Sequence, residues 1–172
     1  NNGGTGKSCS SSGSYLPSEF GKIATRGDCP EGSRYTRDSA SLNVKLKVPI
    51  NAYSFHYKLA FMSEEYGYWY CTQYNDMFIT LLYSDHPDMQ QYIPSNHNIA
   101  KASVEIDGQM ENVGLSINND KFFVYCKSTC NTSPGKCGGT GCSGDLSPLA
   151  GTSYDDNAGS TILTNYATVI PG

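Results

Sequence analysis

The sequence is poor in charge and in long apolar runs. Charged residues make up 16% of the 172 residues, the formal net charge is -4, and Lys45, Lys47 and Lys58 are scattered singly. Nucleic-acid-binding domains gather Lys and Arg on one face, so we expect no nucleic-acid partner. No apolar run approaches the roughly 20 residues that a membrane-spanning helix needs, so we expect no membrane span.

Catalytic motifs are also missing. No GxSxG motif is present, and the three histidines form no triad pattern. Glu64 and Glu65 are the candidates for a glycosidase pair, but neighbours on a strand point to opposite faces and cannot easily flank one bond. We therefore expect that the chain is not an enzyme, and keep a glycoside-active enzyme as an alternative.

The chain does have many cysteines, seven in all. So many thiols are typical of an oxidising compartment, so we predict a secreted or extracellular cell-surface protein. Zinc is the alternative, but the spacing Cys126-x3-Cys130-x6-Cys137-x4-Cys142 lacks the C-x2-C knuckles of zinc ribbons. A Cys9–Cys29 bridge would close a loop of about 20 residues and contribute about 3 kcal/mol. The cysteines expected in disulfides are Cys9, Cys29, Cys126, Cys130, Cys137 and Cys142.

Short stretches of alternating apolar and polar residues predict β-strands. The clearest alternation runs from Leu42 to Val48, and a second runs from Phe55 to Phe61. The apolar run from Met77 to Tyr83 favours a strand buried on both faces, and Asp107-Gly108 is typical of a turn. Further strands are expected at 104–106, 113–117, 122–125, 162–163 and 167–169. No helical period of useful length is present, so we predict an all-β antiparallel sandwich of jelly-roll type.

We expect one domain over residues 1–172. Residues 1–40 are rich in Gly and Ser and form an irregular arm that contains Cys9 and Cys29. The β-sandwich occupies 42–172, and a cysteine-rich insertion occupies 126–145. The expected fold is thus a sandwich whose irregular arms are stapled by disulfides.

The stretch FHYKLAFMSEEYGYWYCTQYNDMFITLL, residues 55–82, resembles the signature of the choice-of-anchor L domain of bacterial surface proteins. INNDKFFVYC resembles the family's Asn-rich turn and the strand after it, and GSTILTNYATVIPG resembles the approach to its C-terminal strands. The cysteine-rich insertion is most similar to versions in myxobacterial and related secreted proteins. The resemblance implies an extracellular domain linked to adhesion, with no established enzymatic activity.

Two departures from that family pattern lead to further predictions. Cys71 stands where family members commonly carry a small residue, so it is the candidate for an unpaired or intermolecular thiol. The family's final strands are missing after Gly172. A sandwich without them leaves an open edge, so we expect either a C-terminal remainder of the same protein or strands from another chain to complete the sheet.

Two groups of residues in the SEEY-to-ND stretch are candidate binding sites. Glu64, Glu65, Asn75 and Asp76 supply hard oxygen ligands for Ca²⁺, and the alternative is that they fix a long loop through hydrogen bonds. Tyr68, Trp69 and Tyr70 can stack on a surface carbohydrate or can plug the end of the sandwich. Asn131 begins an Asn-Thr-Ser sequon and is a candidate glycosylation site.

These observations together predict an extracellular adhesion or structural module, including a subunit of a fibre or larger surface assembly. The expected partners are other protein chains, with surface carbohydrate as a further candidate. The alternative function is a calcium-dependent, lectin-like carbohydrate-binding module.

Overall fold

The computed structural model describes residues 29, 40–66, 69–126, 142–154 and 158–171. Its secondary structure consists of short strands and three short 3-10 helices. The strands are β1 (Ser54–Leu59), β2 (Met62–Ser63), β3 (Met77–Phe78), β4 (Ala102–Ile106), β5 (Gln109–Val113), β6 (Leu115–Ser116), β7 (Phe123–Cys126), β8 (Ala158–Ser160) and β9 (Leu163–Thr168). The 3-10 helices are η1 (Pro87–Tyr92), η2 (Asp120–Phe122) and η3 (Ser147–Leu149). The prediction of an all-β chain is confirmed.

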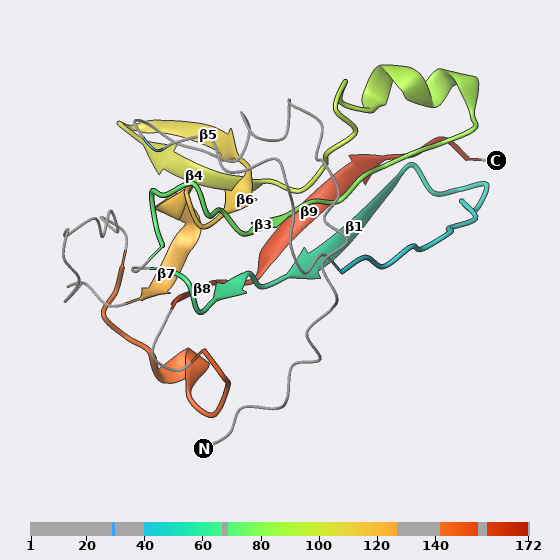
Figure 1. Ribbon diagram of the computed structural model, residues 1–172. Helices are drawn as coiled ribbons and strands as arrows, with labels where there is room; N and C mark the ends of the chain where they lie inside the picture. Colours follow the sequence, from blue (N-terminus) through green and yellow to red (C-terminus); the bar gives the residue numbers. More distant parts are fainter. Residues whose placement is uncertain (1–28, 30–39, 67–68, 127–141, 155–157, 172) are drawn as a thin grey trace.

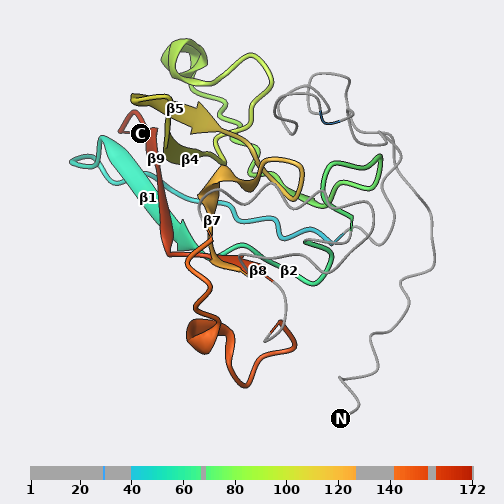
Figure 2. The same ribbon diagram turned by 90° about the vertical axis from the view of Figure 1, so that its left-hand side faces the viewer.

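All strand pairs are antiparallel, and they form four small sheets. The orders are β1-β9, β2-β8-β7, β3-β6 and β4-β5. Figures 1 and 2 show the β4–β5 hairpin and η1 toward the top and η3 at the bottom, with the long β1–β9 pair between these levels. Among the described residues these sheets are not closed into a sandwich, so the jelly-roll type stays a prediction.

The alternating pattern from residue 55 onward forms β1 as predicted. Phe55, Tyr57 and Leu59 are half-buried, while the residues between them are exposed. Asp107 and Gly108 both have positive φ angles, 51° and 79°, which is the requirement of the tight turn that joins β4 to β5. Sequence pattern and backbone agree in these two places.

The prediction of a fully buried strand from Met77 to Tyr83 is wrong. Only Met77 and Phe78 form a strand, and Leu81 makes an isolated bridge with Asn98. Phe78, Leu81 and Tyr83 are exposed. One face of this run packs against the protein, and the other reaches solvent.

The core lies between β4, β6, β7 and β8. Leu115, Ile117 and Phe123 are almost completely buried there, and Phe123 packs against Tyr66 with ring centroids 4.5 Å apart. Gly159 of β8 allows η3 to pack closely, because a Cβ at that position would lie 2.8 Å from Leu149 Cδ2. The core therefore joins elements from both halves of the chain.

Side chains of buried asparagines form hydrogen bonds between segments that are not joined by strand pairing. Asn98 Oδ1 accepts hydrogen bonds from the main-chain nitrogens of Thr80 (3.2 Å) and Ala100 (3.0 Å). Asn165 Oδ1 on β9 accepts from the Lys101 nitrogen at 2.7 Å. An amide side chain both donates and accepts, so it can replace a strand neighbour for an isolated main-chain group.

Candidate functional site

The loop between β2 and β3 contains most of the predicted site residues, and Asn118 holds it in place. Asn118 Oδ1 accepts from the Cys71 nitrogen at 2.8 Å, and Nδ2 donates to the Thr72 oxygen at 2.7 Å. In return, the Asn118 main-chain nitrogen donates to Asn75 Oδ1 at 3.0 Å, and the main-chain nitrogen of the preceding residue, Ile117, donates to the main-chain oxygen of Asp76 at 3.0 Å. Asn118 is completely buried. We call these contacts the Asn118 clamp.

Cys71 lies inside this clamp and is bonded to Cys29. The two Cα atoms are 4.6 Å apart, and Cys71 has a φ of 58°, in the left-handed region. The predictions of an unpaired Cys71 and of a Cys9–Cys29 bridge are therefore wrong. The clamp holds the backbone at Cys71 in a conformation in which its sulfur bonds to Cys29. The spacing of the cysteines in the sequence does not predict this pairing.

The second disulfide joins Cys126 to Cys142, with Cα atoms 5.0 Å apart. Both cysteines were predicted to be in disulfides, and this is confirmed. Cys9, Cys130, Cys137 and the candidate glycosylation site Asn131 lie outside the described residues. Two disulfides are compatible with an oxidising compartment such as the cell exterior.

The described aromatic residues of the loop divide into an inner pair, of which one is buried and one half-buried, and an exposed pair. Tyr66 is in the core, and Tyr70 packs against it at 5.7 Å. Trp69 is 38% exposed and meets the 49% exposed Tyr74 edge to face at 4.9 Å. Tyr68 lies outside the described residues. Trp69 and Tyr74 thus present aromatic surface to solvent, and carbohydrate binding there stays a prediction.

Of the four proposed calcium ligands, the structure brings two carboxylates near each other. Burial and the negative charge of Asp76 raise the pKa of Glu65, and partial burial of its carboxyl raises the pKa of Asp76, although the side chain as a whole reaches solvent. Asn75 Oδ1 already accepts from the Asn118 nitrogen, and Glu64 is exposed. No three His, Cys, Asp or Glu residues in the described part of the chain gather as a metal site would require. Calcium binding stays a prediction.

Replacing Asp76 by Asn should stabilise the protein at pH 7 by about 0.5 kcal/mol, since exposed or half-exposed charges interact weakly. A carboxyl whose pKa is raised by folding destabilises the folded state when ionised, and the cost disappears below its ordinary pKa of 3.8. The gain from D76N should therefore be full at neutral pH and vanish near pH 3. Urea unfolding at both pH values, in EDTA, measures it.

E64Q is the matched control, because Glu64 is exposed and lies in the same loop. It should leave the free energy of unfolding nearly unchanged at both pH values. A loss of stability in D76N at pH 7 would contradict the expected cost of burying the ionised Asp76 carboxyl. Repeating the urea unfolding with millimolar Ca²⁺ in place of EDTA tests the calcium prediction. If calcium binds at this site, it should stabilise the wild type and should not stabilise D76N.

A second candidate site lies before β1, in the extended stretch of residues 40–48, which we call the apolar segment. It was predicted as a strand, and the prediction is wrong for the described chain, because none of its residues belongs to a strand. Leu42, Val44 and Leu46 are 87%, 67% and 61% exposed. Within the described residues, the segment makes no main-chain hydrogen bond before the turn in which the Ala52 nitrogen donates to the Pro49 oxygen. Figure 1 shows it as an extended cyan trace that leads through this turn into β1.

Further exposed apolar side chains follow the apolar segment in the sequence and lie on the β1–β9 pair. Ile50 in the turn and Tyr53 after it are 82% and 70% exposed. Tyr166 on β9 is 71% exposed, and its ring is tilted against that of His56 on β1 with centroids 5.6 Å apart. Monomeric soluble proteins rarely expose large contiguous apolar surfaces that have no partner. The surface around β1 therefore has the composition of a contact site.

Sequence reasoning missed Asn118 and the exposure of the apolar segment. Asn118-Asn119 was interpreted as part of a turn, and the turn is present at residues 117–118, but nothing in the sequence pairs Asn118 with Cys71 and Thr72. Asparagine is common in ordinary turns that follow a β-strand, so its presence there does not indicate a special role. The signal available was the unusual number of polar residues in an otherwise apolar stretch.

Comparisons with protein-family models, curated proteins and solved structures each find no match to this chain. The resemblance to the choice-of-anchor L domain stays a prediction. In the described part of the chain, no helix is long and apolar enough to cross a membrane. The structure defines the class of the protein as a disulfide-containing, antiparallel all-β protein.

Proposed function

We propose that this protein is an extracellular structural or adhesion module that binds another chain by strand addition at its apolar segment. The observation that carries the proposal is the exposure of Leu42, Val44 and Leu46 in an extended backbone whose hydrogen-bonding groups are unused within the described chain. An added strand gains main-chain hydrogen bonds along the segment and apolar contacts from every second residue. Such a chain serves as a subunit of a fibre or of a larger surface assembly.

The neighbouring sheet supports this proposal. The apolar segment leads through a tight turn into β1, and β1 pairs only with β9 among the described strands, so its second edge has no described strand neighbour. Two-stranded sheets are marginal in water and gain stability from further strands. The energy of association would thus come from completing a sheet as well as from covering apolar side chains.

Val44→Pro separates strand addition from simple apolar contact. Proline has no N–H and is excluded from the interior of a sheet, so V44P should abolish binding of a partner strand. Because Val44 is exposed and the segment makes no main-chain hydrogen bond with the described residues, V44P should change the free energy of unfolding by less than about 0.5 kcal/mol. Val44→Thr is the matched control, since threonine keeps the N–H and a high strand propensity.

The experiment selects octapeptides from a random displayed library on the immobilised full chain, then measures amide hydrogen exchange of the protein with and without the best peptide. The expected result is new protection confined to residues 42–48 and adjoining β1, which V44T retains and V44P loses. Selected peptides that protect other regions and bind V44P equally well would contradict the proposal.

A further inference from the structure

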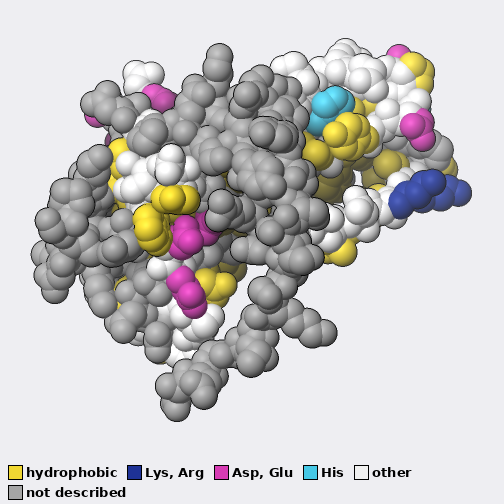
Figure 3. Space-filling model, viewed as in Figure 1, with side chains coloured by type: hydrophobic (Ala, Val, Ile, Leu, Met, Phe, Trp, Pro, Cys, Tyr) yellow, Lys and Arg dark blue, Asp and Glu magenta, His cyan; other side chains and the backbone are white. Residues whose placement is uncertain are grey.

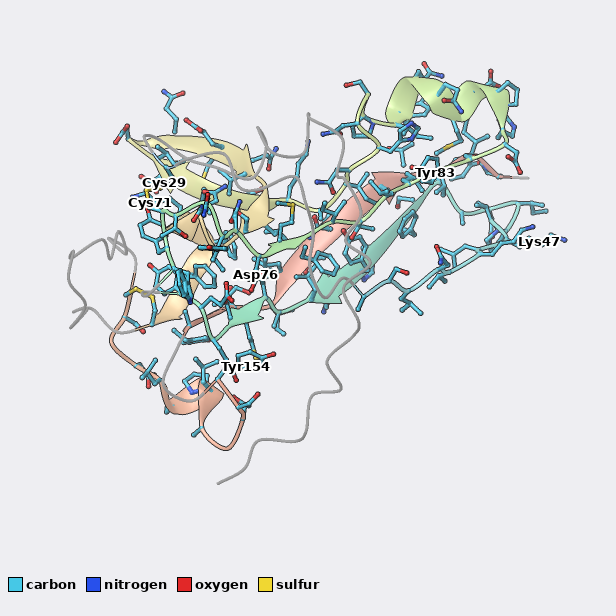
Figure 4. All side chains as sticks on the ribbon, in the orientation of Figure 1. Cys29, Lys47, Cys71, Asp76, Tyr83 and Tyr154 are labelled. Atoms are coloured by element: carbon cyan, nitrogen blue, oxygen red, sulfur yellow. A yellow bond between two sulfur atoms is a disulfide. The ribbon has the colours of Figure 1, made fainter. Side chains whose placement is uncertain are left out.

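The charge of the apolar segment restricts which strand can pair with it. Leu42, Val44 and Leu46 alternate with Asn43, Lys45 and Lys47, so the apolar residues occupy one face and the polar residues the other. In Figure 3 the Lys and Arg side chains drawn on the visible face gather at one tip, and Figure 4, in the same orientation, labels Lys47 at that tip. The segment is therefore apolar on one face and positively charged on the other.

The lysines of the segment are not neutralised by an ion pair with any of the residues that the structure describes. Within the described part of the chain neither Lys45 nor Lys47 makes an ion pair, and both are exposed. Lys58 adds another positive charge in the exposed row of β1. The local charge is positive although the formal net charge of the whole chain is -4.

Pairing with a second copy of the same segment would oppose like charges. An antiparallel pair that matches all four apolar residues places Leu42 opposite Val48 and Val44 opposite Leu46. In that register Lys45 faces Lys45 of the second copy, and directly opposed like charges destabilise a strand pair. A parallel pair in register stacks both lysines on themselves. Lysines on an open edge are a common device against such self-pairing.

From these observations we infer that the partner strand is acidic, an extended segment in which Asp or Glu alternates with apolar residues. This inference rests on the proposed strand addition and specifies its partner. An antiparallel partner with Glu at every second position places carboxylates opposite Lys45 and Lys47 while its apolar residues cover Leu42, Val44 and Leu46. Opposite charges across a strand pair favour the complex, and they also speed the encounter of the two chains.

The test uses three labelled octapeptides in which Val alternates with Glu, Ser or Lys, and measures their affinity for the full chain by fluorescence anisotropy. We expect the Glu peptide to bind at least tenfold more tightly than the Ser peptide and the Lys peptide to bind most weakly. Raising the salt to 0.5 M should reduce the advantage of Glu, since salt screens exposed charges at these distances.

A charge-reversed variant, K45E/K47E, should invert the order so that the Lys peptide binds most tightly. Lys101→Glu is the matched control, because Lys101 is exposed and precedes β4, outside the segment, and it should keep the wild-type order. Equal affinity for the Glu and Ser peptides would overturn the acidic partner and leave strand addition intact. Absence of binding by all three peptides, to both the wild type and the reversed variant, would overturn strand addition as well.

Discussion

Replacing Asn118 by alanine is expected to lower the free energy of unfolding by about 3 kcal/mol, because two main-chain groups lose their partners. The Cys71 nitrogen and the Thr72 oxygen are held at 2.8 and 2.7 Å by the two ends of one buried amide. Alanine leaves both main-chain groups without these partners at a completely buried position. Chemical denaturation monitored by circular dichroism measures the loss.

Asn112→Ala is the matched control. Asn112 lies on the exposed face of β5, where its side chain accepts from Ser103 Oγ at 2.7 Å, and this exposed contact should contribute less than about 0.5 kcal/mol. An N118A protein within 1 kcal/mol of the wild type would show that the clamp does not hold the loop.

Asn118→Asp gives a more specific result than alanine. Aspartate keeps an acceptor for the Cys71 nitrogen but, when ionised, points a second acceptor at the Thr72 oxygen. The buried carboxylate should therefore have a raised pKa, so the protonated form is favoured in the folded state. By linkage, N118D should be least stable at neutral pH and recover part of its stability as the pH falls.

Removal of the Cys29–Cys71 disulfide by the double substitution C29S/C71S is expected to cost roughly 4 kcal/mol, since its loop is long. The two cysteines are 42 positions apart in sequence, against 16 for Cys126–Cys142, for which the same reasoning gives roughly 3 kcal/mol. Denaturant unfolding under non-reducing conditions gives the difference from the wild type.

Mild reduction followed by alkylation and mass spectrometry checks the same disulfide without substitution. Cys29 and Cys71 are both partly exposed, whereas Cys126 is completely buried, so Cys29–Cys71 should open first. Labelling of Cys126 and Cys142 before Cys29 and Cys71 would contradict this order. Because the disulfide and Asn118 hold the same loop, their effects on stability should not be additive.

The local features of the fold could be predicted from the sequence. Alternation locates β1, and Asp107-Gly108 locates the turn between β4 and β5, because each depends only on neighbouring residues. The apolar segment has the same alternation as β1 and yet forms no strand with the described residues. Alternation shows that a stretch can pair along one face, whereas the presence of a partner depends on distant parts of the chain.

The sequence predicted many of the residues that belong to the candidate site, but it did not predict which of them contact or bond to one another. Glu65 and Asp76 come together because the loop folds back, which their separation in sequence does not reveal. The pairing of Cys71 depends on the Asn118 clamp, which joins residues 47 positions apart. Seven cysteines are too many for sequence alone to choose among the possible pairings.

The separation of the apolar segment from the folded core has a consequence for how the protein can diverge. Under the proposed function, mutations at Leu42, Val44, Lys45 or Lys47 alter what the segment recognises. These residues are exposed and make no main-chain hydrogen bond with the described residues, so such mutations should carry little cost in stability. Recognition and folding can therefore change independently in this chain. Related proteins can exchange partners through a few substitutions before β1 while the Asn118 clamp and the disulfide-linked core stay as they are.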